Sequence, residues 1–419
     1  MTENEKWLYT MQVYDDYERR FAKARIEKDE YLPTDENARA RIIARIKEII
    51  GFDENKIPSV HAVEEIHREK CEKYDIIELR YMTWENFYGI ATYYEPHNKG
   101  PHPLAFTLCG HGNHGRRTET YATMARRLAN LGFASIVLDN IGQGDRESLG
   151  HWSAYAPLAL GISLQGMIVM ETIGVIRYMT SREEIDSSRI VACGNSGGGT
   201  LTLLLSALAP ELSAIASAGY PSEFHYILSK ERNHCSCNIL PGIAHGPEMW
   251  EVLSCFAPKP LMIEQGLFDD LIPYDYFERC ARKVAHCYRA LGAERCFTHE
   301  KAATKHPWEE SDISIIAKFL TSAVGLPFTE GGEFISFESI AHKTVTIPEN
   351  ALTTAEMAEI LTGKKLHRGD VKYSDIFYPK YKGLPVDKEK LVENIGRGEV
   401  LEILAQMEAT LWEGKSWGV

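Results

Sequence analysis

The sequence predicts an α/β fold built on a largely parallel sheet. Through the middle of the chain, short apolar runs alternate with longer segments of helical periodicity, and the apolar runs are near-continuous. Strands of this kind are buried on both faces, by helices that lie between them in sequence. With 44% hydrophobic and 25% charged residues over 419 positions, the chain has the composition of a soluble globular protein with a sizeable core.

The N-terminal region is expected to be helical up to about residue 75. Residues 35–50 place five isoleucines on one face, and Gly51 supplies the stop. Beyond residue 75 the period changes to two. Residues 77–82 and 88–94 are rich in β-branched and aromatic side chains around a polar turn, which indicates an antiparallel pair of strands.

The alternating region supplies the rest of the sheet. We expect strands at residues 104–108, 135–138, 190–193, 214–218, 261–263 and 294–298, and helices at 120–130, 160–179, 198–209, 276–291 and 311–320. Residues 220–256 lack a clear period and are expected to form a lid-like insertion in a catalytic domain spanning 76–325. Residues 326–419 are expected to form a mostly irregular C-terminal extension, with helices expected at 354–363 and from Asp387. The sequence leaves open whether this extension covers a pocket or forms an oligomer interface.

Charge and hydropathy exclude several function classes. The net charge is −13 with no basic cluster, which argues against nucleic acid or an anionic membrane as a partner and favours a small-molecule or neutral polymeric one. The best apolar run, residues 201–218, is interrupted by Pro210 and Glu211, so no membrane span is expected. Residues 1–7 are charged and carry no secretory signal pattern, so we expect a cytoplasmic protein whose nine cysteines are reduced thiols.

The strongest chemical signal is Gly194-Asn195-Ser196-Gly197-Gly198, between an expected strand and an expected helix. G-x-S-x-G in this context presents a serine nucleophile on a sharp turn, with helix N-terminal amides beside the developing oxyanion. Its glycines avoid collisions with the neighbouring strand and helix. The alternative, a phosphate-binding loop, lacks both the Lys-Ser/Thr of a P-loop and G-x-G-x-x-G.

A serine nucleophile requires a base and an orienting acid, expected in the order Ser, Asp/Glu, His. Asp269 and Asp270 follow the strand at 261–263, where a parallel sheet gathers its site, and both are candidates for the acid. His306 is preferred as the base because it lies in a loop before a helix, whereas His299 falls within the last expected strand.

The loop after residues 104–108 contains three glycines and is expected to complete the oxyanion hole. We expect the backbone N–H of Gly197 to act together with that of Gly112 or Asn113. His111 and His114 in this loop are interpreted as anchors of the loop rather than metal ligands. The sequence His234-Cys235-Ser236-Cys237 lacks a second pair at zinc-finger spacing, so neither a metal nor a cofactor is expected.

Four further residues are candidates for substrate contact. Arg116 and Arg146 lie in loops near the expected site, where they either pair with an acidic substrate or serve as salt-bridged supports, the second being favoured. His245 and Trp250 in the irregular segment are candidates for lining the acyl or alcohol pocket.

Taken in order, four segments resemble the α/β-hydrolase superfamily, specifically its acetyl xylan esterase-like and dienelactone hydrolase-like branch. They are residues 109–116, 139–146, 194–200 and 257–261, the last followed by Gly266-x-x-Asp269-x-x-x-Pro273. The resemblance covers roughly residues 35–325 and implies an α/β-hydrolase fold with Ser196 as nucleophile, Asp269 as acid and His306 as base. It also implies a short-chain, acetyl-type ester of a sugar-like alcohol as substrate. Because no export signal is visible, a small imported ester is favoured over polymeric xylan.

The sequence therefore predicts a serine carboxylesterase that works through an acyl-enzyme. A serine peptidase of the prolyl oligopeptidase type is a second hypothesis, disfavoured because the roughly 75 residues before the first strands are too few for a propeller domain. A hydrolase-like binding protein with a vestigial site is a third, and the intact set of nucleophile, acid and base argues against it.

Overall fold

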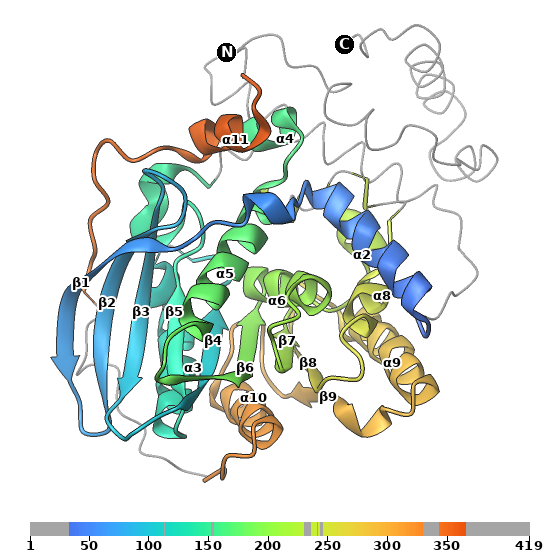
Figure 1. Cartoon of the computed structure of the whole chain (residues 1–419). Coiled ribbons are helices and arrows are strands. Elements are labelled where there is room, and N and C mark those ends of the chain that lie inside the picture. Colours follow the sequence, from blue (N-terminus) through green and yellow to red (C-terminus); the bar gives the residue numbers. More distant parts are fainter. Residues whose placement is uncertain are drawn as a thin grey trace, which may run out of the picture.

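The protein is described from a computed structural model that covers residues 33–365, apart from 113, 152–154, 230–235, 241, 244–245 and 330–342. Within these residues the chain forms a nine-stranded sheet in the order β1-β2-β3-β5-β4-β6-β7-β8-β9 (Figure 1). The strands are β1 (His61–Lys70), β2 (Tyr74–Met82), β3 (Tyr88–Pro96), β4 (His102–Leu108), β5 (Ala134–Leu138), β6 (Ile185–Asn195), β7 (Ala214–Ala218), β8 (Leu261–Gly266) and β9 (Phe297–Ala302).

The sheet is antiparallel at one edge and parallel elsewhere. β1, β2, β3 and β5 pair antiparallel in turn, whereas β5, β4, β6, β7, β8 and β9 are parallel neighbours. The chain leaves β4 to form β5 on one side and then β6 on the other, so the strand order reverses around β4. In open α/β sheets, such a reversal marks the crevice where ligands bind.

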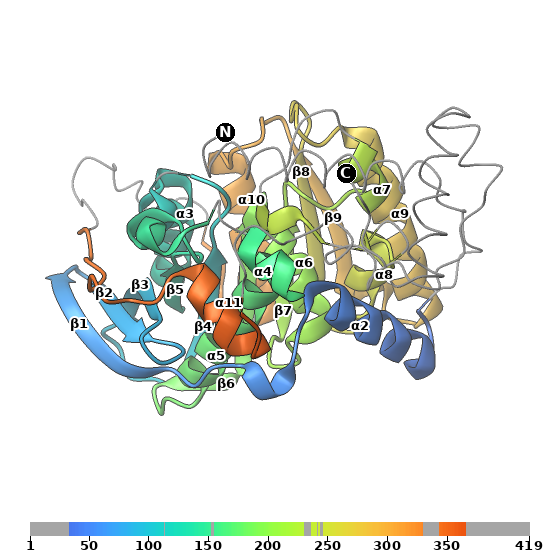
Figure 2. The ribbon, with the colours of Figure 1, turned by 90° about the horizontal axis from the view of Figure 1, so that it is seen from above.

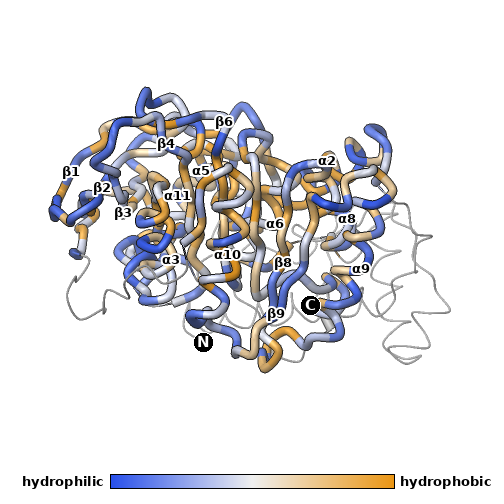
Figure 3. The backbone as a smooth tube through the Cα atoms, turned by 90° about the horizontal axis from the view of Figure 1, so that it is seen from below, coloured by the Kyte–Doolittle hydropathy of each residue, from blue (hydrophilic) through white to orange (hydrophobic). Residues whose placement is uncertain are grey.

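Helices cover both faces of the sheet, as Figure 2 shows from above. The helices are α2 (Glu36–Ile50), α3 (Glu119–Asn130), α4 (Tyr155–Leu160), α5 (Leu164–Thr180), α6 (Gly197–Leu208), α7 (Phe224–Ser229), α8 (Met249–Ser254), α9 (Tyr274–Ala290), α10 (Glu310–Ala323) and α11 (Thr354–Thr362). Apolar residues of α3 and α10 pack in one core, and those of α2, α5, α6, α8, α9 and α11 pack in the other. Figure 3 shows hydrophobic colours along the inner strands and along α5 and α6, which belong to the buried interior.

Sequence pattern explains why the central elements form. Every residue of β4, β5, β7 and β8 is buried, so these strands are mostly apolar and have no solvent-exposed polar face. Helix α2 begins at the N-cap Asp35, whose side chain accepts from the N–H of Ala38, and it ends at Gly51 with φ of 72°. The predicted α/β class and mostly parallel sheet are confirmed.

Two predictions about elements are wrong. Residues 61–70 form the edge strand β1 rather than helix, because pairing with β2 outweighs their charged, mostly exposed sequence. The last strand begins at Phe297 rather than at Glu294, since residues Glu294–Cys296 form a 3₁₀ turn.

The segment at 220–256 is more ordered than the sequence suggested. It contains α7, a 3₁₀ turn at Ser236–Asn238 and α8. Helix α8 is part of the core: Trp250, Val252 and Leu253 are buried there. At least this end of the predicted lid-like insertion is therefore built into the fold.

The described part of the C-terminal region also belongs to the folded body. α11 agrees with the helix expected at 354–363 and lies beside α4 (Figure 1). Its Met357, Ala358 and Leu361 are buried against the larger core. The second expected helix, from Asp387, lies outside the described residues.

Candidate active site

The nucleophile candidate Ser196 lies on a strained turn between β6 and α6. Its φ and ψ are 60° and −118°, a conformation rarely adopted by residues other than glycine. The turn is possible because its neighbours lack side chains: an added Cβ would lie 2.4 Å from the Gly198 carbonyl oxygen at Gly194, and 2.0 Å from the Leu108 oxygen at Gly198. The observed geometry is the strand-turn-helix setting that the sequence predicts.

Asp269 and His306 are joined by a hydrogen bond. His306 Nδ1 lies 2.7 Å from Asp269 Oδ2, and Nδ1–H donates because the carboxylate only accepts. Asp269 follows β8 and His306 follows β9, so the two meet beyond the carboxyl ends of neighbouring parallel strands. Asp270 is exposed and His299 is exposed on β9, whereas Asp269 is buried.

The Asp269 carboxylate accepts four hydrogen bonds. Besides His306, Gln265 Nε2 donates to Oδ2 at 2.7 Å, and the N–H groups of Leu271 and Ile272 donate to Oδ1 at 2.7 and 3.1 Å. Burial alone would raise the pKa of Asp269, but the hydrogen bond and charge of His306 and the two backbone donors outweigh it and lower the pKa below its usual range. The carboxylate is thus held ionised against the imidazole.

The second ring nitrogen of His306, Nε2, is available to accept a proton. Since Nδ1 carries the proton donated to Asp269, Nε2 of the neutral ring carries the lone pair. Nε2 is buried and has no hydrogen-bond partner within the described part of the chain. An imidazole in this state is poised to accept a proton.

Asn195 links the nucleophile turn to the loop that carries His306. Its side-chain amide donates to the His306 carbonyl oxygen at 2.9 Å, and its Oδ1 lies 2.1 Å from where a Cβ would stand on Gly219. The residue before Ser196 therefore holds the backbone of His306. Sequence reasoning missed this role, since the variable position of G-x-S-x-G gives no signal of its own.

The amides near Ser196 define where an oxyanion could bind. The Ser196 N–H donates a hydrogen bond to the Ala218 carbonyl oxygen at 3.0 Å, so it is not available to an oxyanion. α6 begins at Gly197, so the amide of Gly197 has no partner within its own helix. The expected donor Gly197 is thus oriented by the start of α6.

The loop after β4 lies on the other side of the position where an oxyanion could bind. Pairing of Leu108 with Gly194 places the two strand ends side by side, and an added Cβ on Gly110 would lie 3.0 Å from Ser196 Cβ. The ring of His111 lies against Gly197, with Cε1 and Nδ1 2.9 and 3.0 Å from an added Cβ there. Gly112 is exposed and lies nearer Thr118, so the structure brings His111 rather than Gly112 to Gly197. Asn113 lies outside the described residues.

Arg116 and Arg146 are salt-bridged supports rather than substrate contacts. Arg116 is fully buried and pairs with Glu78 at 3.0 Å, Asp139 at 3.0 Å and Asp145 at 2.7 Å. Arg146 is buried and donates to both oxygens of Glu171 at 2.7 and 2.8 Å. Of the two roles that the sequence left open, the structure agrees with the favoured one, the salt-bridged support, and neither guanidinium group is accessible to a substrate.

The two remaining predicted pocket residues have different outcomes. Trp250 is buried in the core on α8, so it packs the scaffold instead of lining a pocket. His245 lies outside the described residues. Leu267 and Phe268 directly precede Asp269 and are exposed, 66% in the case of Phe268, so these apolar side chains flank the acid at the surface.

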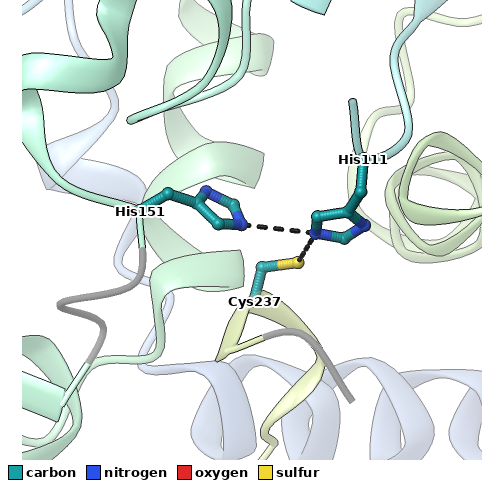
Figure 4. Close-up of side chains that lie close together, drawn as sticks. All are labelled: His111, His151 and Cys237. Carbon is teal, nitrogen blue, oxygen red and sulfur yellow. Dashed lines mark hydrogen bonds between the residues drawn. The ribbon is translucent and has the colours of Figure 1, made fainter. Parts of the chain in front are cut away.

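His111 also has neighbours that the sequence did not group with it. His151 and Cys237 approach its ring to within hydrogen-bonding distance, as Figure 4 shows. His114, in contrast, is exposed at the start of a 3₁₀ turn. Because His151 and Cys237 lie 40 and 126 positions after His111 in the sequence, no local spacing motif could reveal the cluster.

Comparison with known proteins agrees with the fold and with the predicted resemblance. The family model for acetyl xylan esterase (AXE1) matches residues 53–234, a range that includes Ser196 but ends before Asp269 and His306. A curated relative, "Putative hydrolase YtaP" of Bacillus subtilis (strain 168), is 25% identical over 183 residues, which is 43% of this chain and 61% of that protein. The match therefore spans less than two thirds of the relative's length.

Solved structures of low sequence identity share the architecture. Methylesterase BT1017 superposes with a TM-score of 0.60 at 18% identity, covering 89% of this chain and 78% of that one. A glucuronoyl esterase from Solibacter usitatus gives 0.53 at 12% identity, covering 72% and 96%. Among the described residues, no helix is both long and apolar enough to cross a bilayer. The chain has the α/β-hydrolase fold, and its resemblance to the acetyl xylan esterase-like branch of that superfamily is confirmed.

Proposed function

We propose that the protein is a serine carboxylesterase acting through Ser196, His306 and Asp269. The observation that carries the proposal is the Asp269–His306 hydrogen bond of 2.7 Å, tied through Asn195 to a serine with φ of 60°. The match of residues 53–234 to the acetyl xylan esterase model and the similarity to a hydrolase support hydrolysis as the reaction.

The mechanism follows from the protonation pattern. His306 Nε2 accepts the proton of Ser196 Oγ as the oxygen attacks the ester carbonyl, and Asp269 stabilises the imidazolium that forms. The Gly197 amide, with a second donor from the His111 loop, stabilises the negative charge on the carbonyl oxygen. The imidazolium then protonates the leaving alcohol. Water attacks the acyl-enzyme with His306 again acting as base, and the acid is released.

A short acyl group on a small or sugar-like alcohol is the proposed substrate. The support is the name of the matching family, acetyl xylan esterase, together with structural relatives whose names describe esterases. Because fold alone does not define the substrate on this scaffold, the acyl group must be found by assay.

A substrate panel tests the proposal. Purified wild type and Ser196→Ala are compared on p-nitrophenyl acetate, butyrate and octanoate, with peptide nitroanilides in parallel. We expect acetate to be hydrolysed fastest and the variant to be inactive. Cleavage of peptides alone would favour the peptidase hypothesis. Absence of hydrolysis of every substrate by both proteins would favour a vestigial site.

A further inference from the structure

Three loops at the carboxyl edge of the sheet bring His111, His151 and Cys237 together. His111 follows β4, His151 follows the 3₁₀ segment Gly144–Leu149, and Cys237 lies in the 3₁₀ turn Ser236–Asn238. His111 Nε2 is 3.3 Å from His151 Nε2 and 3.1 Å from Cys237 Sγ, and the three atoms lie within 4.8 Å of one another. In Figure 4 the two rings point at each other and the thiol points at the same space.

The two separations from His111 Nε2 are close to those of a tetrahedral zinc site. With Zn–N bonds of about 2.0–2.1 Å and a Zn–S bond of about 2.3 Å, tetrahedral angles place two nitrogen ligands about 3.4 Å apart and nitrogen and sulfur about 3.5 Å apart. The observed 3.3 and 3.1 Å differ from these values by a few tenths of an ångström. Two imidazoles and a thiolate are also a donor set that zinc prefers.

The tautomer of His151 is already that of a ligand. Its Nδ1 lies 2.7 Å from the Ile141 carbonyl oxygen, which can only accept, so Nδ1 carries the proton and Nε2 of the neutral ring carries a lone pair. Histidines bound to metals commonly donate their other N–H in this way, which fixes the orientation of the ring. His151 and Cys237 are both buried, so their positions are set by the fold.

Gln143 marks a fourth position. Its amide nitrogen is 3.1 Å from His151 Nε2, while its side-chain oxygen is buried without a hydrogen-bond partner in the described chain. A half-turn of the amide exchanges the two atoms and would direct the oxygen towards the cluster. The oxygen could then bind a metal or accept from a metal-bound water.

We propose that His111 Nε2, His151 Nε2 and Cys237 Sγ bind one Zn²⁺, with the fourth position beside Gln143. Cys237 binds as the thiolate and releases its proton on binding. The ion would join the three loops, including the loop that faces Ser196. With zinc on Nε2, the proton of the neutral His111 ring lies on Nδ1, at the ring edge that faces Gly197. The proposal does not rest on the esterase assignment.

Metal analysis of the full-length protein tests the site. After extraction with dipicolinate, the apo protein is titrated with Zn²⁺ in competition with a chromophoric chelator, and bound metal is counted by inductively coupled plasma mass spectrometry. We expect one tight site per chain, weakened at least about tenfold by Cys237→Ser and by His151→Ala. Co²⁺ in the site should show intense visible bands of tetrahedral geometry and a thiolate charge-transfer band that Cys237→Ser removes.

Matched variants separate this site from other thiols and imidazoles. Cys255→Ser, which changes a half-buried thiol that contacts the Glu251 carbonyl, and His299→Ala, on exposed β9, should both bind zinc as wild type does. Should Cys237→Ser fail to fold, protection of Cys237 from iodoacetamide by zinc in the wild type, mapped by peptide mass, replaces it. Equal zinc affinity of wild type and folded Cys237→Ser, no binding by wild type, or unprotected Cys237 would overturn the proposal.

Discussion

At the residue scale, Asp269, the proposed orienting acid, is the member of the candidate site with the most fully defined contacts. Asp269 accepts from His306, Gln265 and two backbone amides. We expect Asp269→Asn to lower kcat by roughly 10³–10⁴-fold with little change in KM, because an amide can donate to His306 and so favours the wrong tautomer. Steady-state kinetics on p-nitrophenyl acetate measures this. The exposed neighbour supplies the control, since Asp270→Asn should leave kcat within about twofold; equal losses in both variants would contradict the assignment.

The lowered pKa of Asp269 also predicts a dependence of stability on pH. Because the folded state binds this proton less readily than the unfolded state, the ionised carboxylate stabilises the fold above the ordinary aspartate pKa of about 3.9. This contribution is lost as pH falls through the lower folded-state value. The difference in Tm between wild type and Asp269→Asn should therefore narrow from about pH 6 to about pH 3, measured by scanning fluorimetry. A difference that stays constant over this range would refute the linkage.

The sequence predicted the positions of single candidate residues better than it predicted their surroundings. Ser196, Asp269 and His306 could be chosen because the strand-turn-helix context and chain order constrain them. The burial of Arg116 and Arg146 could not, because their carboxylate partners come from β2, from the loop after β5 and from α5. Such pairings depend on tertiary contacts that no local pattern contains.

At the element scale, the loop between β9 and α10 positions His306, the proposed base. Asp312, the third residue of α10, accepts from the Glu309 N–H at 2.7 Å and from the Thr304 hydroxyl at 2.8 Å, so it binds the loop on both sides of His306. Asn195 binds the loop at His306 itself. The loop is therefore fixed at three points around the imidazole.

We expect Asp312→Ala to lower both stability and kcat. Loss of the cap and of the buried acceptor should cost about 1–3 kcal/mol of unfolding free energy, because the buried Thr304 hydroxyl and the partly buried Glu309 N–H both lose their partner. Urea unfolding and ester kinetics measure the two effects. Ser311→Ala, one residue earlier and exposed, is the matched control and should change neither. An unchanged kcat in a folded Asp312→Ala protein would show that the loop holds His306 without this anchor.

Elements with a strong apolar period were predicted closely, and those without one were not. β7 was expected at residues 214–218 and is observed there. Its five consecutive buried residues form a short apolar run, which is the pattern of a strand in the interior of a sheet. β1 was missed because an edge strand with a solvated face keeps charged residues, such as Glu64, Glu65 and Arg68, that conceal its period. Its formation depends on pairing with β2 across the intervening turn.

At the scale of the whole molecule, the described C-terminal segment is part of the same folded body as the sheet. The Lys343 carbonyl accepts from buried Arg116, the Val345 N–H donates to Asp145, and Thr354 donates to the Gly150 carbonyl. Residues 343 and 345 thus add backbone hydrogen bonds to the ion-pair cluster around Arg116. No local pattern predicts these contacts, because they join positions about 200 residues apart.

Truncation tests this contribution. A chain ending at residue 329 loses the buried side chains of Met357, Ala358 and Leu361, and we expect its Tm to fall sharply, since each large apolar side chain contributes about 1.5–3 kcal/mol. A chain ending at residue 365 keeps every contact described for this segment and serves as the control. Similar Tm values for the two truncations would show that the segment is dispensable for stability.

The account as a whole depends on Ser196 being the nucleophile that His306 activates. Covalent labelling with a fluorophosphonate, followed by intact-mass measurement and peptide mapping, tests this most directly in wild type, Ser196→Ala and His306→Ala. We predict one adduct per wild-type chain on the peptide containing Ser196, no adduct in Ser196→Ala, and labelling at least about 10²-fold slower in His306→Ala. An adduct on another residue would contradict the proposed mechanism. So would wild-type protein that hydrolyses the ester but forms no adduct with the fluorophosphonate.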